Sequence, residues 1–285
     1  MLLHPVSNSR VGNKRASPWG ALFVCLLVSV AGPAPAYSAQ ALVAPGCVAD
    51  RLDETAVLAT VVDGDTLRLK DGRSVRLIGI NTPEIGCDGK PSEPLAVQAR
   101  EDLRSLLGPA AVLGLRYGRE RQDRYGRLLA HVYLADGRSV EEQLLRAGLA
   151  AHIVVPPNSG NAACYQAAEH LARTADKGVW REHYRPLPVA EVPAGARGFR
   201  VITGRVLSVG QSKKSWWLNF TPRPRKGETA TGVAVRISRD DLVQFDTDRL
   251  SALPGRTIIV RGWLSPYKKQ LVLRLRHPAN LEVPG

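Results

Sequence analysis

Apolar and polar residues alternate along positions 55–80, and two Asp-Gly pairs interrupt the alternation. This pattern predicts short antiparallel β-strands joined by tight turns. The last strand, at 76–80, is almost wholly apolar after its first residue, yet it runs directly into the sequence Asn-Thr-Pro-Glu at 81–84. Polar residues at the end of a buried strand are expected at the rim of a sheet, where oxygens from neighbouring strands converge.

Three later segments place their apolar residues at helical spacing. The expected helices cover 94–107, 140–147 and roughly 161–176, and Gly148 is expected to end the second. Between the first two helices, two strand-like runs flank a charged loop, and a further Asp-Gly pair marks a turn. The hydrophobic pattern therefore predicts a domain at 55–182 that is mainly β with helices, of the α+β class.

The pattern changes after this domain. Positions 183–197 hold three prolines and little periodicity, which predicts a linker. Residues 198–285 read as five short alternating strands, with one helical piece at 239–245 between the third and the fourth. These elements fit a second, small all-β domain of the OB-like barrel type.

The N-terminus has the three parts of a secretory signal peptide: a basic start, an apolar core and small residues ending in Ala-Pro-Ala at 34–36. The apolar core is short for a membrane span, so we expect residues 1–36 to be removed. The alternatives are cleavage after Ala39 and retention as an uncleaved anchor. Residues 37–54 then form an N-terminal segment, and no stable membrane insertion is expected after processing.

Net charge separates the two halves of the processed chain. The full chain of 285 residues carries 39 Lys and Arg against 26 Asp and Glu, a formal net charge of +13. Removal of residues 1–36 takes away three cations and no acids, which leaves 13 − 3 = +10. Residues 37–197 contain 20 cations and 20 acids, whereas 198–285 contain 16 and 6, so the last third holds the whole excess. Such a basic segment indicates a polyanionic partner.

Oxygen-bearing groups near two strand ends are candidate metal ligands. Asp65 lies in the turn Asp-Gly-Asp-Thr at 63–66, and Asn81 and Thr82 end the strand that a hairpin joins to it. Carboxylate, amide and backbone carbonyl oxygens are the ligands that Ca²⁺ prefers. The predicted metal site therefore consists of the Asp65 carboxylate, the Asn81 amide and the Thr82 carbonyl. The cysteines lack the spacing of a zinc site.

Two arginines and a glutamate supply the other parts of a phosphodiesterase. Arg76 begins the strand that ends at Asn81, and Arg127 lies in the sequence Asp-Arg-Tyr-Gly-Arg at 123–127. Guanidinium groups bind phosphate oxygens in pairs and stabilise the charge that builds up on phosphorus. Glu84 can accept a proton from an attacking water. Each motif alone is also an ordinary turn sequence, so the hypothesis depends on their joint order.

Four motifs resemble, in their order and spacing, the staphylococcal nuclease, or thermonuclease, family. They are DGDT at 63–66, RLIGINTPE at 76–84, DRYGR at 123–127 and LLRAGLA at 144–150. The resemblance extends over about 125 residues, a whole domain of ordinary size. It implies a five-stranded OB-type barrel with three helices. It also implies Ca²⁺-dependent hydrolysis of DNA and RNA to 3′-phosphorylated products.

The resemblance also implies roles for individual residues. By motif position, Asp65 resembles a calcium ligand, and Thr82 resembles the residue that lends its backbone carbonyl to the metal. Tyr125, inside the third motif, is the expected substrate contact in this domain. The residues that resemble the family's catalytic set are Arg76, Glu84 and Arg127.

Two departures from the family pattern alter this picture. Asn81 stands where the family often has a second acidic metal ligand, so one negative charge is lost and metal binding should weaken. Two valines and two prolines occupy 154–157, where family members can place tyrosines against the nucleotide. The resemblance therefore implies an intact catalytic set with altered metal and base contacts.

Cys47, Cys87 and Cys164 remain after the signal peptide, which predicts one disulfide and one leftover thiol in an oxidising compartment. In the family, the loops that carry Cys87 and Cys164 border the active-site cleft, so the resemblance favours a Cys87–Cys164 bond. The alternative pairs Cys47 with Cys164 and pins the N-terminal segment, because spacing does not decide connectivity.

Aromatic residues are interleaved with cations in 198–285, a segment that also looks like the small OB-like tails of some bacterial thermonucleases. Exposed aromatics among cations suit base stacking with neutralisation of phosphates. Strand alternation buries about half of such side chains, and either Trp217 or Leu218 is expected to point inward. The expected phosphate contacts lie in turns: Lys213, Lys214, Lys268 and Lys269.

The leading hypothesis is an exported nuclease, periplasmic or secreted, that requires Ca²⁺, acts on DNA and RNA and carries a basic OB-like accessory domain. No protein partner is implied. One alternative is a nucleic-acid-binding protein with a degenerate nuclease site, which the change at Asn81 favours. Another is an envelope protein that binds acidic polymer through the basic domain.

Overall fold

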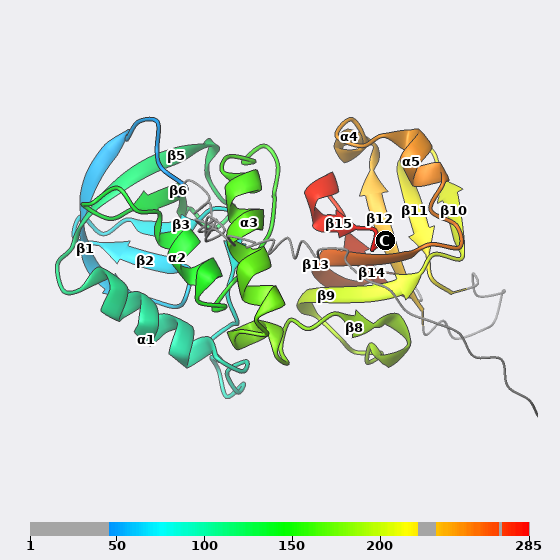
Figure 1. Ribbon diagram of the computed structural model, residues 1–285, viewed down its shortest axis with the longest axis horizontal. Helices are drawn as coiled ribbons and strands as arrows, with labels where there is room; N and C mark the ends of the chain where they lie inside the picture. The colour runs from blue at the N-terminus through cyan, green and yellow to red at the C-terminus, as the bar shows by residue number, and fades with distance from the viewer. Residues whose placement is uncertain (1–45, 222–231, 268–269, 285) are drawn as a thin grey trace, which may run out of the picture. The chain divides into compact units, whose positions relative to one another are not determined.

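The computed structural model describes residues 46–221, 232–267 and 270–284 (Figure 1). The predicted signal peptide at 1–36 and the predicted contacts Lys268 and Lys269 lie outside these ranges. Within them, no helix is both long enough and apolar enough to cross a membrane.

Five strands close into a barrel, as the alternation and the resemblance predicted. In ring order they are β1 (Glu54–Val61), β2 (Thr66–Leu69), β3 (Ser74–Leu77), β6 (Leu128–Tyr133) and β5 (Val112–Gln122). Strand β1 pairs with β5 through its first half and with β2 through its second half, so one strand completes the ring. Strands β3 and β6 run parallel, and the other neighbours are antiparallel. The fully buried side chains of Leu67, Val75 and Leu115 contribute to the barrel core.

Three helices accompany the barrel at the positions that periodicity predicted: α1 (Ala96–Leu107), α2 (Val140–Arg146) and α3 (Ala162–Thr174). Helix α1 buries Ala99 and Leu103 in the same core as the strands. Helix α2 begins after Ser139, whose hydroxyl oxygen accepts a hydrogen bond from the Glu142 N–H. Gly148 follows it with a φ of 71°, the left-handed conformation in which glycine ends a helix without steric cost.

The end of β3 explains how an apolar strand leads into a polar cluster. Gly79 has a φ of 85°, and an added Cβ would lie 2.7 Å from the Tyr165 ring, so the turn requires glycine. After this turn, β4 (Ile80–Asn81) leaves the barrel and pairs with β7 (Ala151–His152). The redirection buries Thr82, the next residue along the chain.

A second sheet of eight strands follows. Its strands are β8 (Leu187–Pro188), β9 (Gly198–Arg205), β10 (Ser208–Gln211), β11 (Ser215–Asn219), β12 (Val233–Ser238), β13 (Thr257–Tyr267), β14 (Gln270–Arg274) and β15 (Leu281–Glu282). The short helices are α4 (Arg239–Leu242) and α5 (Thr247–Ser251), with single 3-10 turns η1 (Gly178–Trp180), η2 (Val189–Glu191) and η3 (Pro278–Asn280). The helical piece predicted at 239–245 contains α4; the Asp246 side chain caps α5, a second helix that was not predicted.

The second sheet repeats the connectivity of the barrel. Its neighbours follow the order β10-β11-β12-β14-β13-β9-β8, with β15 on β13. Strands β9 and β10 form one extended run that pairs first with β13 and then with β11, as β1 pairs with β5 and β2. Between them, the Val206 N–H bonds to the Arg256 carbonyl and the Leu207 N–H to the Asn219 carbonyl. The second sheet therefore has the strand order of the first barrel, which is compatible with the predicted OB-like type.

The segment at 183–197 contains the short strand β8 and the 3-10 turn η2, two elements that the prediction of a linker did not include. Strand β8 pairs in parallel with β9 at the edge of the second sheet, where proline is tolerated because an edge strand can spare an N–H. The Tyr184 ring is buried against Trp180 and Phe199, within one apolar cluster that joins the two domains. The prolines therefore shape an edge strand instead of a flexible connection.

A buried ion pair lies in the same interface. Arg261 on β13 donates to both carboxylate oxygens of Glu169 on α3, at 2.7 and 2.6 Å, and to the His152 carbonyl at 3.1 Å. The two charged side chains are only 3% and 2% exposed. Glu282 on β15 provides a second carboxylate for Arg261. A buried ion pair thus links the second domain to helix α3 of the first.

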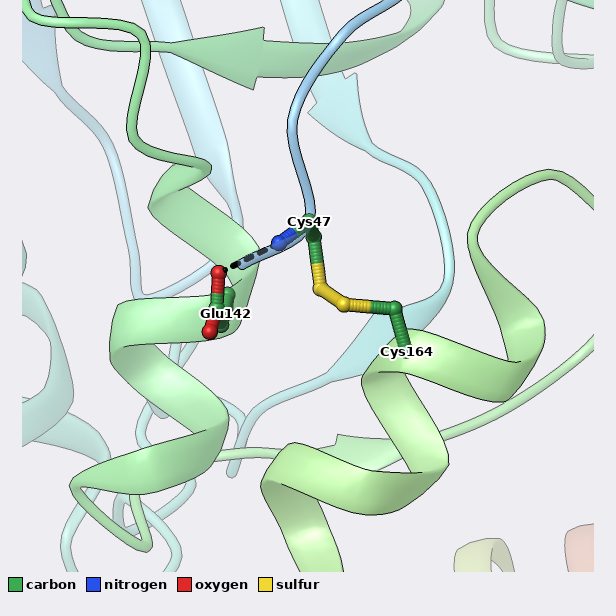
Figure 2. Close-up of side chains that lie close together, drawn as sticks. All are labelled: Cys47, Glu142 and Cys164. Atoms are coloured by element: carbon green, nitrogen blue, oxygen red, sulfur yellow. Dashed lines mark hydrogen bonds between the residues drawn. A yellow bond between two sulfur atoms is a disulfide. The ribbon is translucent and has the colours of Figure 1, made fainter. Parts of the chain in front are cut away.

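The disulfide joins Cys47 to Cys164, so the predicted Cys87–Cys164 bond is wrong (Figure 2). The Cys47 N–H donates to Glu142 Oε2 at 2.8 Å, which holds the segment before β1 on α2, beside the start of α3. Cys87 is an exposed free thiol. In the described part of the chain, Cys47, Glu142 and Cys164 also form the one grouping with metal-ligand spacing, but the disulfide removes their sulfurs from metal binding. The spacing of the cysteines in the sequence does not reveal that the N-terminal segment packs against α2, so it could not predict this pairing.

Replacing both Cys47 and Cys164 by serine is expected to lower the free energy of unfolding by about 2–4 kcal/mol, because the bond closes a long loop of the unfolded chain. The bonded residues are 117 positions apart. Urea denaturation measures the loss. Cys87→Ser is the matched control and should leave the unfolding free energy unchanged. Equal losses in the two variants would contradict this account of the bond.

Candidate active site

The turn between β1 and β2 brings a carboxylate against the start of the polar cluster. Asp65 is buried, and its Oδ2 accepts hydrogen bonds from the Thr82 N–H at 3.0 Å and from the Thr82 hydroxyl at 3.1 Å. Gly64 permits this approach, since an added Cβ would lie 2.7 Å from the Thr82 hydroxyl oxygen and 2.9 Å from the Ala99 Cβ. The two motifs that were expected to converge are therefore in direct contact.

Arg76 belongs to the same group of contacts. Its Nη2 lies 3.0 Å from Asp65 Oδ2 and donates to the Ile80 carbonyl at 3.1 Å. Its Nη1 donates to the Leu77 carbonyl at 2.7 Å. The Arg76 side chain is 13% exposed, so protein acceptors fix its orientation before any ligand binds.

Asn81 acts in this structure as a hydrogen-bond donor. Its Nδ2 donates to the Thr82 carbonyl at 3.0 Å and to the Tyr184 hydroxyl at 3.1 Å, while its Oδ1 accepts from Arg76 at 3.4 Å. A carboxylate at this position would have no proton for either of the first two contacts. The amide therefore holds the predicted carbonyl ligand in place and links it to the buried Tyr184.

Glu84 is exposed on a loop that Glu93 anchors. The Glu84 N–H donates to Glu93 Oε2 at 2.9 Å, and His183 and Arg200 each lie 3.3 Å from the Glu93 carboxylate. Burial opposes ionisation of Glu93, but the hydrogen bonds from His183 and the Glu84 N–H lower its pKa to about 2. Because Arg200 lies on β9, the second domain contributes to the support of the loop that carries Glu84.

Asp63 is a site residue that the sequence-based prediction missed. Burial and the neighbouring charge of Asp65 raise the pKa of Asp63 to about 6, although Arg76 acts in the opposite direction. Asp63 Oδ1 also accepts a hydrogen bond from the Asp65 N–H at 3.0 Å, the usual contact of an Asp-Gly turn. The sequence signal of Asp63 is therefore that of a turn residue, and its electrostatic role appears only with the fold.

Asp63, Asp65 and Glu84 form a carboxylate cluster whose members repel one another. Burial, then the charges of Asp65 and Asp63, raise the pKa of Glu84, and Arg76 offsets only part of this effect. A hard dication that takes carboxylate and carbonyl oxygens would relieve the repulsion. The Asp65 carboxylate, the Asn81 amide and the Thr82 carbonyl offer oxygens to such an ion, and Asp63 and Glu84 add negative charge nearby.

The hairpin between β5 and β6 brings the second arginine to the carboxylate cluster. Arg127 Nη1 lies 3.4 Å from the hydroxyl oxygen of Thr66, the neighbour of Asp65 in the sequence, and its Nε donates to Asp123 at 2.8 Å. The Arg127 side chain is 31% exposed, which leaves it accessible to a ligand. Its guanidinium lies 5.6 Å from the ring centre of Tyr125, which is itself 68% exposed.

The other predicted substrate contacts are not part of this site. Lys213 and Lys214 are exposed in the turn between β10 and β11 of the second domain. The first domain thus brings together the exposed residue Glu84, two guanidinium groups and the oxygen-bearing groups of Asp65 and Thr82. Such an arrangement can bind a phosphodiester, stabilise charge on phosphorus and accept a proton from water.

Comparison with known proteins points to the same chemistry. Residues 74–182 match the family described as "Staphylococcal nuclease homologue". The chain is 35% identical over 130 residues to the thermonuclease of Staphylococcus intermedius, covering 45% of this chain and 76% of the relative. It is 32% identical over 131 residues to the thermonuclease of Staphylococcus hyicus, with the same two coverages of 45% and 76%. The endonuclease YncB of Bacillus subtilis (strain 168) is 33% identical over 128 residues, which cover 43% of this chain and 60% of the relative.

Proposed function

The chain belongs to the staphylococcal nuclease family and is a nuclease, and from this premise we propose that it is an exported, Ca²⁺-dependent enzyme that hydrolyses DNA and RNA to 3′-phosphorylated products. The observation that carries the proposal is the contact of Asp65 with both Thr82 and Arg76, which assembles the site from distant motifs. The disulfide supports export, because such bonds persist in oxidising compartments.

Glu84 is the proposed general base. Glu84 is an exposed residue, so water and substrate can reach it, and partial desolvation of its carboxylate raises its pKa, which makes it a better proton acceptor than an ordinary glutamate. Glu93 holds the Glu84 backbone, which limits movement of the loop. Glu84 takes a proton from the water that attacks phosphorus.

The two arginines have complementary parts in the proposal. Arg76 is held by Asp65 and backbone carbonyls, so its charge is already oriented when the substrate binds. Arg127 is more exposed and is free to pair with a phosphate oxygen. Both stabilise the negative charge that grows on the phosphoryl oxygens as water attacks.

The proposed ligands for Ca²⁺ are the Asp65 carboxylate, the Asn81 amide oxygen and the Thr82 carbonyl, with Asp63 and Glu84 adding negative charge nearby. When bound, Ca²⁺ supplies positive charge that polarises the phosphodiester. Burial is the main cause of the raised pKa of Asp63 and of Glu84, and repulsion between the carboxylates raises both further. A cation at this place would relieve that repulsion.

The test is cleavage of single-stranded DNA, double-stranded DNA and RNA by the purified chain, with Ca²⁺, with Mg²⁺ and with a chelator. We expect cleavage with Ca²⁺ and its loss with the chelator. Glu84→Ala, prepared in the same way, controls for contaminating nucleases. Cleavage that persists in the chelator would overturn the calcium requirement.

Asn81→Asp is expected to lower the Ca²⁺ concentration for half-maximal cleavage by about tenfold, because an added charge near a dication is worth on the order of 1 kcal/mol or more. The same change should lower stability in chelator, since aspartate cannot donate to the Thr82 carbonyl and places a negative charge beside it, although the Tyr184 hydroxyl can donate to the new carboxylate. Calcium titration of cleavage and urea denaturation in chelator measure the two effects.

Tyr184→Phe is the matched control for this variant. It removes one partner of Asn81 without adding charge, so it should reduce stability and leave the calcium requirement unchanged. If Asn81→Asp requires as much calcium as the unmodified protein, residue 81 is not a ligand.

A further inference from the structure

The second domain presents a row of large polar and aromatic side chains on the outer face of its sheet. Trp217 on β11 is directly opposite Arg236 on β12, and Arg236 is opposite Arg274 on β14. The adjacent residues Leu218 and Val235 are fully buried in the core. Strand alternation therefore directs the row away from the core and resolves the choice between Trp217 and Leu218.

Two aromatic rings and one guanidinium come together on this face. The ring centres of Trp217 and Tyr267 are 5.8 Å apart, with 36° between the ring planes. The Arg236 guanidinium lies 5.8 Å from the centre of the Trp217 ring and 5.7 Å from that of Tyr267. Arg236 Nε donates to the Ser215 hydroxyl at 2.8 Å, which holds the cation in place. We refer to Trp217, Arg236 and Tyr267 as the stacking platform.

Core packing does not account for the stacking platform. Trp216 packs against the core of the second domain, and Trp263 contacts Phe199 in the interface cluster with a ring-centre distance of 5.5 Å. Trp217 is half-buried and Tyr267 is 39% exposed, and both lie on the face turned away from the core. The Arg236 guanidinium lies close enough to both rings for cation–π contact.

The charge around the platform favours an anionic ligand. Lys213 and Lys214 are exposed in the turn that leads into β11. Asp241 balances part of the positive charge by pairing with Arg274 and Arg276, but neither of its contacts reaches Arg236. Residues 198–285 as a whole carry 16 cations against 6 acids. A ligand that offers both flat rings and regular negative charge matches these features.

We propose that the stacking platform binds unpaired bases of single-stranded nucleic acid, with the nearby cations neutralising its phosphates. The proposal rests on the proposed nuclease function, because it assigns the second domain to hold the same polymer that the first domain cuts. Unpaired bases expose their faces for stacking, whereas the bases of a duplex are covered by their neighbours. The platform therefore gives the second domain a preference for single strands that net charge alone would not produce.

The test compares polyanionic ligands that differ in whether they offer unpaired bases. Binding of fluorescent oligothymidylate to the full chain is measured in chelator, where cleavage is not expected, beside an abasic oligomer of the same length, a DNA duplex and heparin. Trp217→Ala and Tyr267→Ala are each expected to weaken oligothymidylate binding by about tenfold or more, in line with the loss of one stacked base. Binding of the abasic oligomer should change by less than about threefold, because it depends on phosphate contacts.

Two kinds of control accompany these variants. Trp217→Phe and Tyr267→Phe keep a ring and should retain most of the binding. Arg249→Ala removes the cation of a side chain that is 89% exposed and lies outside the platform. It should weaken the binding of all the polyanions slightly and to the same extent. Thermal unfolding of each variant shows whether the second domain remains folded.

Equal losses for oligothymidylate and the abasic oligomer would overturn the proposal, because the rings would then contribute no base contact. Heparin binding that is as tight as oligothymidylate binding and equally sensitive to Trp217→Ala would instead assign the platform to acidic polysaccharide. Calcium-dependent hydrolysis of a thymidine dinucleotide, assayed on the same preparations, tests the nuclease proposal separately. Its absence from the unmodified protein would count against that proposal and leave the binding result standing.

Discussion

Arg127→Ala is expected to reduce phosphodiester cleavage about 1,000-fold or more, the effect of removing an arginine that stabilises charge in phosphoryl transfer. The guanidinium is directed toward the carboxylate cluster through Thr66, and its partial exposure leaves it free to pair with phosphate. Glu84→Gln should cause a loss of similar size, since the amide cannot accept the proton of water. Initial rates on single-stranded DNA at saturating Ca²⁺ measure both losses.

Arg124→Ala is the matched control for Arg127→Ala. Arg124 is exposed in the same hairpin, and its guanidinium lies 4.9 Å from the Tyr125 ring centre and donates to the Tyr125 hydroxyl at 2.8 Å. It should retain activity within a few fold. Thermal unfolding should be nearly unchanged in all three variants, because none removes a buried side chain. Equal activities of Arg124→Ala and Arg127→Ala would contradict the role assigned to Arg127.

Arg261→Met is expected to lower the free energy of unfolding by about 3–5 kcal/mol, because it leaves Glu169 as a buried charge without its main partner. Arg173 lies 3.9 Å from Glu169 and compensates only weakly at that distance. The double variant Arg261→Met/Glu169→Leu should recover most of the loss, since no buried charge then remains unpaired. Urea denaturation of the two single variants and the double variant measures the coupling.

The opposite result for this pair is also informative. If Arg261→Met and the double variant are equally destabilised, shape and packing decide the stability of the interface, and the ion pair contributes little. Arg249→Ala is a suitable reference, because the Arg249 side chain is 89% exposed and its pairing with Asp246 lies on the surface.

Features that depend on local pattern were predictable from the sequence. The helices at α1, α2 and α3 follow from apolar spacing, and the barrel strands follow from alternation between Asp-Gly turns. The convergence of Asp65 with Thr82 was predictable because a hairpin joins their strands. Asn81 was identified as a departure from the family, and the structure adds its donor contacts to Thr82 and Tyr184.

Features that depend on packing between distant segments were not predictable. Asp63 looks like a turn residue until burial and the charge of Asp65 raise its pKa. The prolines at 186, 188 and 193 indicated a linker because composition does not reveal an edge strand beside β9. Arg200 is one of the 16 cations of 198–285, and no sequence pattern indicates that it reaches Glu93 in the other domain. Each of these outcomes depends on a partner far away in the sequence.

The pairing of Cys47 with Cys164 also constrains the order of events while the chain is being made. Cys87 emerges 87 − 47 = 40 residues after Cys47, whereas the native partner emerges 117 residues after it. An oxidase that joins thiols in the order of their appearance would make the Cys47–Cys87 bond first and so exclude the native one. With such an oxidase, the native bond would form only if oxidation waited for the start of α3 or if thiol exchange released the early bond. A chain with Cys87→Ser would be free of this competition.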